Sequence, residues 1–273
     1  GSAADLSFSD FIYNLAPVIA IILAAYVITI YFLFRKSFHV SSELKARIRD
    51  FRANRAIRDK NLLVKSLAVL GGVILLFLIH HKLDLEAATI AIAGAAVLKL
   101  ISKADPDESF QHVEWTTVFF FIGLFIIVEG LVKIGFIDII ANNALALTGG
   151  DMKITTLVVL WFSAFFSAVV DNIPYTATMI PIVKHLGEVI ATNLDMMPHT
   201  VLRPLWWSLA LGACLGGNGT VIGASANVII VGVAKKNGYK ITFFQFLKYG
   251  MLFLIESVLI SSVYIYVRYL SFF

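Results

Sequence analysis

One short polar stretch interrupts an apolar run and has the residue types to bind an ion. It begins with Asp171 and Asn172, continues through Pro174, and adds the hydroxyls of Thr176 and Thr178. A carboxylate in apolar surroundings is costly, so it pairs with a cation or carries a proton. Asn172 is expected to cap the next helix, and Pro174 fits the first turn of that helix. The pattern therefore predicts that Asp171 pairs with another group, binds a cation or carries a proton.

A second interruption combines glycines with amide and hydroxyl side chains. Its members are Gly217, Asn218, Gly219, Thr220, Ser225 and Asn227. Glycine permits turns that are closed to other residues, and the Asn and Thr side chains supply polar ligands beside those turns. We expect both interruptions to line one substrate or ion site, with no tightly bound metal.

Interruptions of this kind have a specific meaning in a membrane. In the hydrocarbon interior of the bilayer, non-helical backbone is tolerated only inside protein or along a water-filled cavity. Transporters use broken helices to aim the charged ends of half-helices at a ligand. Packing kinks are the alternative, because a single Pro or Gly most often marks one. Two interruptions within fifty residues, each with Asn and Thr at the break, favour a site.

The composition requires a membrane environment. Of the 273 residues, 59% are apolar and 15% are charged, whereas soluble domains average about 45–50% and about 25%. The apolar residues form long blocks and do not alternate, which favours helices. The single cysteine, Cys214, excludes an internal disulfide and is expected to be a small buried core residue. The predicted fold class is an all-α polytopic membrane protein.

Five segments have the composition of membrane spans, which need about 20 mostly apolar residues. They are residues 14–34, 62–80, 86–102, 115–134 and 245–270. The interrupted segments cover about 153–190 and 203–234, and each of their halves is too short to span alone. We interpret 153–190 as a re-entrant hairpin and 203–234 as one unwound transmembrane helix.

The loop 35–65 sets the predicted orientation. It carries ten of the 22 basic residues, so the positive-inside rule makes it cytoplasmic. Both ends of the chain then lie outside. The three lysines within 235–240 fall inside only if the hairpin enters and leaves on the outer side, which supports that interpretation. The expected localisation is the cell membrane, as a multi-pass protein.

The interrupted segments also resemble a known family. Residues 163–181 look like the outer hairpin of the ArsB/NhaD branch of the ion-transporter superfamily. Residues 217–227 are similar to the second unwound helix of that branch, and 113–125 matches it as well. The branch contains arsenite exporters, sodium–proton antiporters and the mammalian P protein. The Asp-Asn-Ile-Pro sequence resembles the antiporter and P-protein side more than the arsenite pump, whose hairpin has Asn before Asp.

The resemblance implies the second half of an inverted-repeat ion transporter. It also implies that Asp171 is the proton or sodium carboxylate, with Na⁺ held at Asp171 and Asn218. Residues 1–10 then look like the tail of the first repeat's unwound helix, and 11–134 like scaffold helices. Residues 135–234 correspond to the transport portion, and 235–273 to the last transmembrane helix. The implied partners are the lipid bilayer, the missing N-terminal half of the same transporter and a second copy in a homodimer. No nucleic acid partner is expected.

These observations predict a secondary active transporter of inorganic ions, proton-coupled and similar to a Na⁺/H⁺ antiporter. Arsenite or antimonite efflux is the first alternative, and citrate or dicarboxylate transport is a more distant one. An ion channel, from a different class, would keep a continuous pore and need no pair of broken helices. No catalytic or nucleotide-binding motif occurs, so no enzyme activity is expected. No cofactor is expected beyond the coupling ion, Na⁺ or H⁺.

Overall fold

The computed structural model describes residues 4–36, 59–102, 110–111 and 113–273. All regular elements in these residues are helices, and none of them is a strand. At least four stretches are long and apolar enough to cross a membrane. They are Phe8–Phe34, Lys60–Leu83, Trp115–Lys133 and Phe243–Leu270. The predicted class, an all-α multi-pass membrane protein, is confirmed. Most of the basic loop 35–65, and residues 1–3 of the predicted N-terminal tail, lie outside the described residues.

The described residues belong to two compact units. The first draws on Gly1–Tyr13 and Ala24–Trp115, and the second on Asn14–Leu23 and Thr116–Phe273. Helix α1 (Phe8–Phe34) contributes to both. We describe each unit separately. The predicted divisions at residues 10, 134 and 234 stay predictions.

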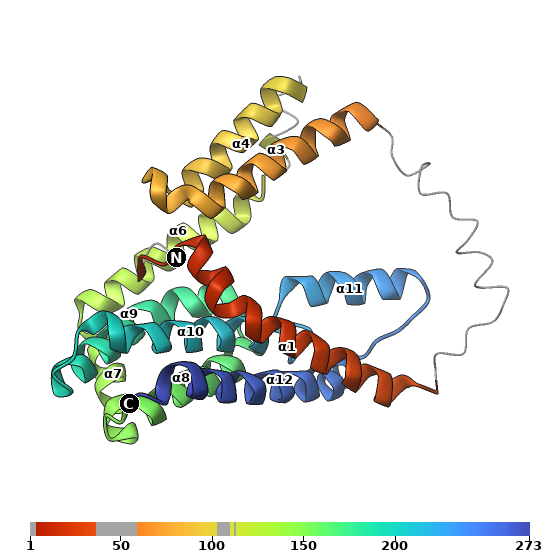
Figure 1. The fold of residues 1–273 in the computed structure, drawn as a ribbon. Coiled ribbons are helices and arrows are strands. Elements are labelled where there is room, and N and C mark those ends of the chain that lie inside the picture. Colours follow the sequence, from red (N-terminus) through yellow and green to blue (C-terminus); the bar gives the residue numbers. More distant parts are fainter. Residues whose placement is uncertain (1–3, 37–58, 103–109, 112) are drawn as a thin grey trace. The chain divides into compact units, whose positions relative to one another are not determined.

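The first unit is built around a helical hairpin (Figure 1). Helix α3 (Lys60–Ile79) passes through the short 3₁₀ helix η3 (His80–Leu83) and returns as α4 (Ala87–Ser102). Gly94 lets the two helices approach closely, because a Cβ there would lie 2.3 Å from Cγ2 of Val73. Helix α4 has 16 residues, fewer than the roughly 20 that a straight span needs.

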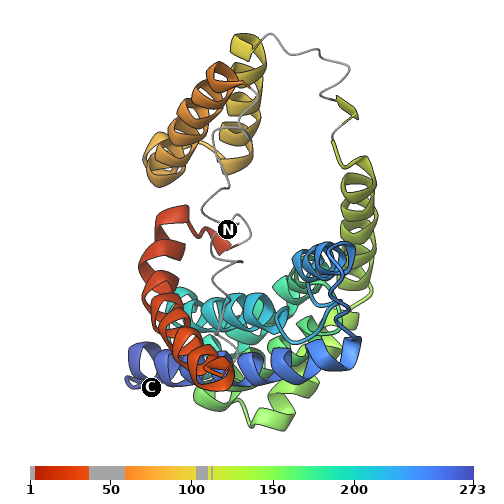
Figure 2. The same ribbon diagram turned by 90° about the vertical axis from the view of Figure 1, so that its right-hand side faces the viewer.

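The second unit contains the remaining helices. They are α6 (Trp115–Lys133), α7 (Phe136–Thr148), α8 (Met152–Ser167), α9 (Asn172–Asn193), α10 (Pro198–Gly216), α11 (Ser225–Lys236), α12 (Phe243–Ile265) and the terminal π-helical turn η4 (Tyr266–Leu270). Helix α10 lies at the centre and packs against α8, α9 and α12, as both views show (Figures 1 and 2). It is also the most completely buried helix of the unit.

Helices α8 and α10 approach each other closely because two glycines, one helical turn apart, face α8. A Cβ at Gly212 would lie 2.4 Å from the carbonyl oxygen of Leu160, and one at Gly216 would lie 2.2 Å from that of Ala164. Small residues at this spacing bring helix backbones together in membranes, where apolar side chains gain little by leaving the lipid. The close contact places the C-terminal ends of α8 and α10 beside each other.

The sequence did not indicate α7 as a separate helix. Residues 136–148 form a helix that bends by 120° into α8, and glycines flank it on both sides. Gly135, Gly149 and Gly150 all have positive φ (73°, 64° and 70°), a conformation that is costly for other residues. The sharp turns before and after α7 therefore depend on these glycines.

Candidate functional site

The first break in the helices covers residues 168–171, between α8 and α9. Asp171 caps α9, because its carboxylate accepts a hydrogen bond from the backbone N–H of Ile173 at 3.2 Å. The prediction that Asn172 is the cap was therefore wrong. Asp171 has extended backbone dihedrals, whereas Asn172 is already helical, and only a residue outside the helix can turn its side chain onto the first N–H groups. Pro174 lies in the first turn of α9, as predicted.

The threonines after the first break mostly serve their own helix. Thr176 donates to the carbonyl of Asn172 at 2.7 Å, and Thr178 donates to the carbonyl of Pro174 at 3.0 Å. Both hydroxyls donate their hydrogen to a carbonyl one turn earlier in α9. What they can still offer a ligand is an acceptor lone pair, which suits a cation or a donor group.

The second break covers residues 217–224, between α10 and α11. It includes Val221 and Ile222, which are apolar but not helical. Gly223 has very little space, since a Cβ there would lie 2.8 Å from the carbonyl oxygen of Gly217. Asn227, in the first turn of α11, donates from its side-chain amide to the carbonyls of Gly217 at 2.8 Å and Thr220 at 2.9 Å.

The two breaks lie directly against each other. The hydroxyl of Thr220 donates to the carbonyl of Ala168 and accepts from the N–H of Gly223 at 3.1 Å. The predicted site residues on the two segments, which are some fifty positions apart in the sequence, therefore form one region of the second unit. Helix α12 covers one side, because a Cβ at Gly250 would lie 2.5 Å from the carbonyl oxygen of Gly219.

Three polar side chains at the breaks have no hydrogen-bond partner among the described residues. They are Asn172 and Asn218, which are half-buried, and Ser225, which is exposed. Asp171 is also half-buried and uses its carboxylate for the single bond to Ile173. These four side chains are free to reach a solute, in contrast to Thr220, which is buried and doubly bonded.

The charge at the breaks is negative. Asp171 is the one charged side chain in residues 168–174 and 217–227, where there is no Lys, Arg or His. A carboxylate beside amide and backbone oxygens is the donor set that alkali cations and protons prefer. The part of the chain that the structure describes holds no group of three or more His, Cys, Asp or Glu suited to a metal ion.

Ser167, the last residue of α8, belongs to this region although it was not among the predicted site residues. Its hydroxyl donates to the carbonyl of Ala213 in α10 at 2.6 Å, across 46 positions of sequence. Nearby, Tyr175 donates to the hydroxyl of Ser163 at 3.1 Å. Cys214 is exposed, so the prediction of a buried core cysteine was wrong. It lies on α10 three residues before the second break.

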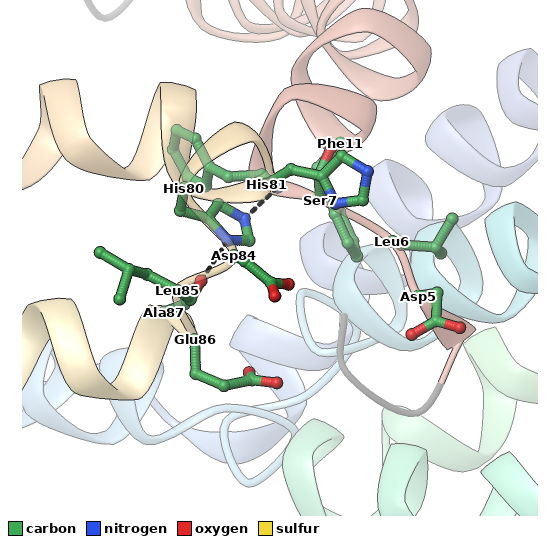
Figure 3. A pocket seen from close by; sticks show the side chains of 11 residues that line it. Asp5, Leu6, Ser7, Phe11, His80, His81, Asp84, Leu85, Glu86 and Ala87 are labelled. Carbon is green, nitrogen blue, oxygen red and sulfur yellow. Dashed lines mark hydrogen bonds between the residues drawn. The ribbon is translucent and has the colours of Figure 1, made fainter.

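The first unit contains a separate surface cavity of about 490 Å³ (Figure 3). The start of α1 and the turn between η3 and α4 line it, with the acidic side chains of Asp5, Asp84 and Glu86. His80 closes one wall, because its Nδ1 pairs with the carbonyl of Leu85 at 2.9 Å and its Nε2 accepts from the N–H of Phe8 at 3.3 Å. No residue predicted for the ion site lies in this cavity.

Comparison with known families gives one match that covers most of the chain. The family model described as "Citrate transporter" matches residues 1–212. No solved structure matches the chain.

Several curated proteins are similar over nearly the whole chain. An uncharacterized transporter of Mycobacterium bovis is 40% identical over 98% of the chain, and a 46 kDa membrane protein of Mycobacterium leprae is 39% identical over 98%. The mouse P protein is 36% identical over 83%. The chain spans 61% of the length of the two mycobacterial proteins and 28% of the P protein.

Proposed function

The chain belongs to the citrate transporter family, and from that membership we propose that it forms the ion-binding part of a secondary active membrane transporter. Its relatives include the P protein, so the predicted membership of the ion-transporter superfamily is confirmed. The observation that carries the proposal is the direct contact of two helix breaks, one of which carries the carboxylate of Asp171. Paired breaks of this kind are the usual way for a transporter to bring polar groups to the bilayer midplane.

The proposed substrate class is inorganic cations, with exchange of Na⁺ and H⁺ as the leading activity. Asp171 is the one acidic side chain at the breaks, and it can hold a proton or a sodium ion but not both at full affinity. The oxygens of Asn218 and Asn172 would complete the shell around sodium. Competition of the two ions for one carboxylate is the simplest basis for antiport.

Citrate transport is the second candidate, because the matching family model carries that description. The two breaks contain no basic side chain that would neutralise a tricarboxylate. Citrate would therefore have to enter with bound cations or meet basic groups elsewhere in the full-length protein. Arsenite or antimonite efflux is a third possibility for the same site, although the single cysteine cannot supply a set of thiolate ligands.

We propose the orientation in which the basic loop 35–65 is cytoplasmic. The proposed partners are the lipid bilayer, the remainder of the same transporter, which would complete the site opposite the two breaks, and a second copy of the protein. We propose no cofactor other than the coupling ion, Na⁺ or H⁺.

Reconstituted flux tests the proposal. The full-length protein, in liposomes with an imposed pH gradient, is given labelled sodium, citrate or arsenite in parallel. Sodium movement that collapses with the pH gradient, together with no uptake of citrate or arsenite, is the expected result. Uptake of citrate driven by the gradient would transfer the assignment to the second candidate. Conductive flux that needs no counter-ion would indicate a channel.

A further inference from the structure

We propose that Ser167, Thr220 and Asn227 are positioning residues that lock the two breaks into one body. We call these three residues the break clasp. The proposal concerns how the site is held, and only its transport readout rests on the proposed function. It reassigns Thr220 and Asn227, which the sequence placed among the ligands, and adds Ser167, which the sequence did not select.

Two side-chain hydroxyls donate hydrogen bonds between the segments that contain the breaks. Ser167 ends α8 and donates to the carbonyl of Ala213, one of the last four carbonyls of α10, which a helix leaves without an internal partner. Thr220 lies in the second break and donates to the carbonyl of Ala168, just past the end of α8. One bond therefore joins the end of α8 to the last turn of α10, and the other joins the second break to the first. An unpaired carbonyl costs several kcal/mol in a membrane interior, so separating the breaks would break both bonds together.

Asn227 holds the second break together through its side-chain amide. Its amide carries two N–H hydrogens, and the two contacts to the carbonyls of Gly217 and Thr220 use both. These contacts join the start and the middle of the second break to the first turn of α11. Asn227 thus fixes the shape of the break that presents Thr220 to Ala168.

Ser167 and Thr220 are less accessible to a solute than the proposed ligands are. Ser167 is fully buried and Thr220 is 6% exposed, whereas Asp171 and Asn218 are half-buried. Backbone fills the space around the clasp, because a Cβ at Gly223 would lie 3.0 Å from the carbonyl oxygen of Ala168 and 3.1 Å from that of Ser167. A solute can therefore reach Asp171 and Asn218 without touching Ser167 or Thr220.

The consequence is mechanical. The breaks cannot change conformation independently. Any movement of residues 217–224 therefore also moves the turn before α9, and with it Asp171. Ligand-binding side chains and positioning side chains should therefore respond differently to substitution. Loss of a ligand weakens ion affinity, whereas loss of a clasp bond loosens both breaks and slows the transport cycle.

Hydrogen exchange measured by mass spectrometry on the full-length protein in detergent tests the clasp directly. Thr220→Val keeps the shape and removes the hydroxyl, and we expect backbone exchange of residues 217–224 to rise about tenfold, the effect of losing one buried hydrogen bond. Thr220→Ser should restore protection. Ser167→Ala, at the end of α8, should raise exchange in the same segment. The matched control is Ser257→Ala, because Ser257 is equally buried but bonds only to Leu254 of its own helix.

Transport kinetics supply the second readout. Thr220→Val should lower the maximal sodium flux about tenfold while changing the KM for sodium less than about twofold, and Asp171→Asn should raise that KM without loosening residues 217–224. The clasp is refuted if backbone exchange in residues 217–224 is unchanged by Thr220→Val and by Ser167→Ala. It is also refuted if Ser167→Ala raises exchange beside Ser167 but not in residues 217–224. A wild-type protein that moves no ion would overturn the proposed function, and the exchange experiment would still decide the clasp.

Discussion

Gly216 is the position where a single methyl group should disturb the site most. Its α-carbon faces the backbone of α8, and a Cβ there would lie 2.2 Å from the carbonyl oxygen of Ala164 and 2.8 Å from that residue's carbonyl carbon and Cα. These atoms are backbone and cannot rotate away. Since ordinary contacts begin near 3.4 Å, Gly216→Ala must push α8 and α10 apart by about 1 Å locally, the kind of displacement that overpacked cores show.

The expected cost is about 3 kcal/mol, the upper part of the range for overpacking, because the same displacement stretches the bond from Ser167 to Ala213. For a chain of this size the melting temperature should fall by roughly 6–12 °C. Thermal unfolding of the full-length protein in detergent, followed by scanning fluorimetry, measures this shift.

Gly232→Ala is the matched control. Gly232 lies in the middle of α11, and a Cβ there meets no atom within 4 Å. Replacing a helical glycine by alanine in open space should be neutral or stabilise by about 0.5–1 kcal/mol. If Gly216→Ala melts at the same temperature as Gly232→Ala, the close contact of α8 and α10 is wrong, and so is the placement of the two breaks side by side.

Three further predictions concern the packing around the site. Tyr175→Phe removes the buried bond to the hydroxyl of Ser163 and should cost about 1 kcal/mol, seen as a lower melting temperature that Ser163→Ala partly compensates. Asp138→Asn keeps an oxygen beside Nδ1 of His185, which is 3.1 Å from Oδ1 in the wild type, but removes its negative charge; because the Asp138 side chain is 57% exposed, the loss should be under about 1 kcal/mol and should shrink further in high salt, measured by melting at two ionic strengths. Gly135→Ala strains a backbone with φ of 73° and should cost about 1–2 kcal/mol, whereas Gly135→Asn should melt closer to wild type because Asn tolerates this conformation.

The membrane spans could be predicted from the sequence because a long apolar run leaves few alternatives in a membrane. The predicted spans 14–34, 62–80 and 115–134 fall on α1, α3 and α6. Helix α7 was missed for an equally physical reason. It is 13 residues long and carries Asp138 and two asparagines, so neither its length nor its composition marks a span.

The candidate site was predictable in its residue types but not in its contacts. The breaks are visible locally, since Pro, Gly and Asn interrupt apolar runs there. Which residue caps α9 depends on backbone dihedrals, and these favoured Asp171 over its neighbour Asn172. The bond from Ser167 to Ala213 joins residues 46 positions apart, and a local sequence pattern cannot predict so distant a hydrogen-bond partner. Assigning Thr220 and Asn227 to positioning likewise required the hydrogen bonds of the folded chain.

The most direct test of the account is the sodium flux of Asp171→Asn beside that of Asp151→Asn. Both aspartates cap helices, α9 and α8 respectively, and asparagine is an equally good cap, so neither change should unfold a helix. With the full-length protein in liposomes under a pH gradient, Asp171→Asn should lose at least about tenfold of the gradient-driven sodium flux, while Asp151→Asn should stay within about twofold of wild type. Equal, undiminished flux in both variants would contradict the assignment of Asp171 as the ion-binding carboxylate.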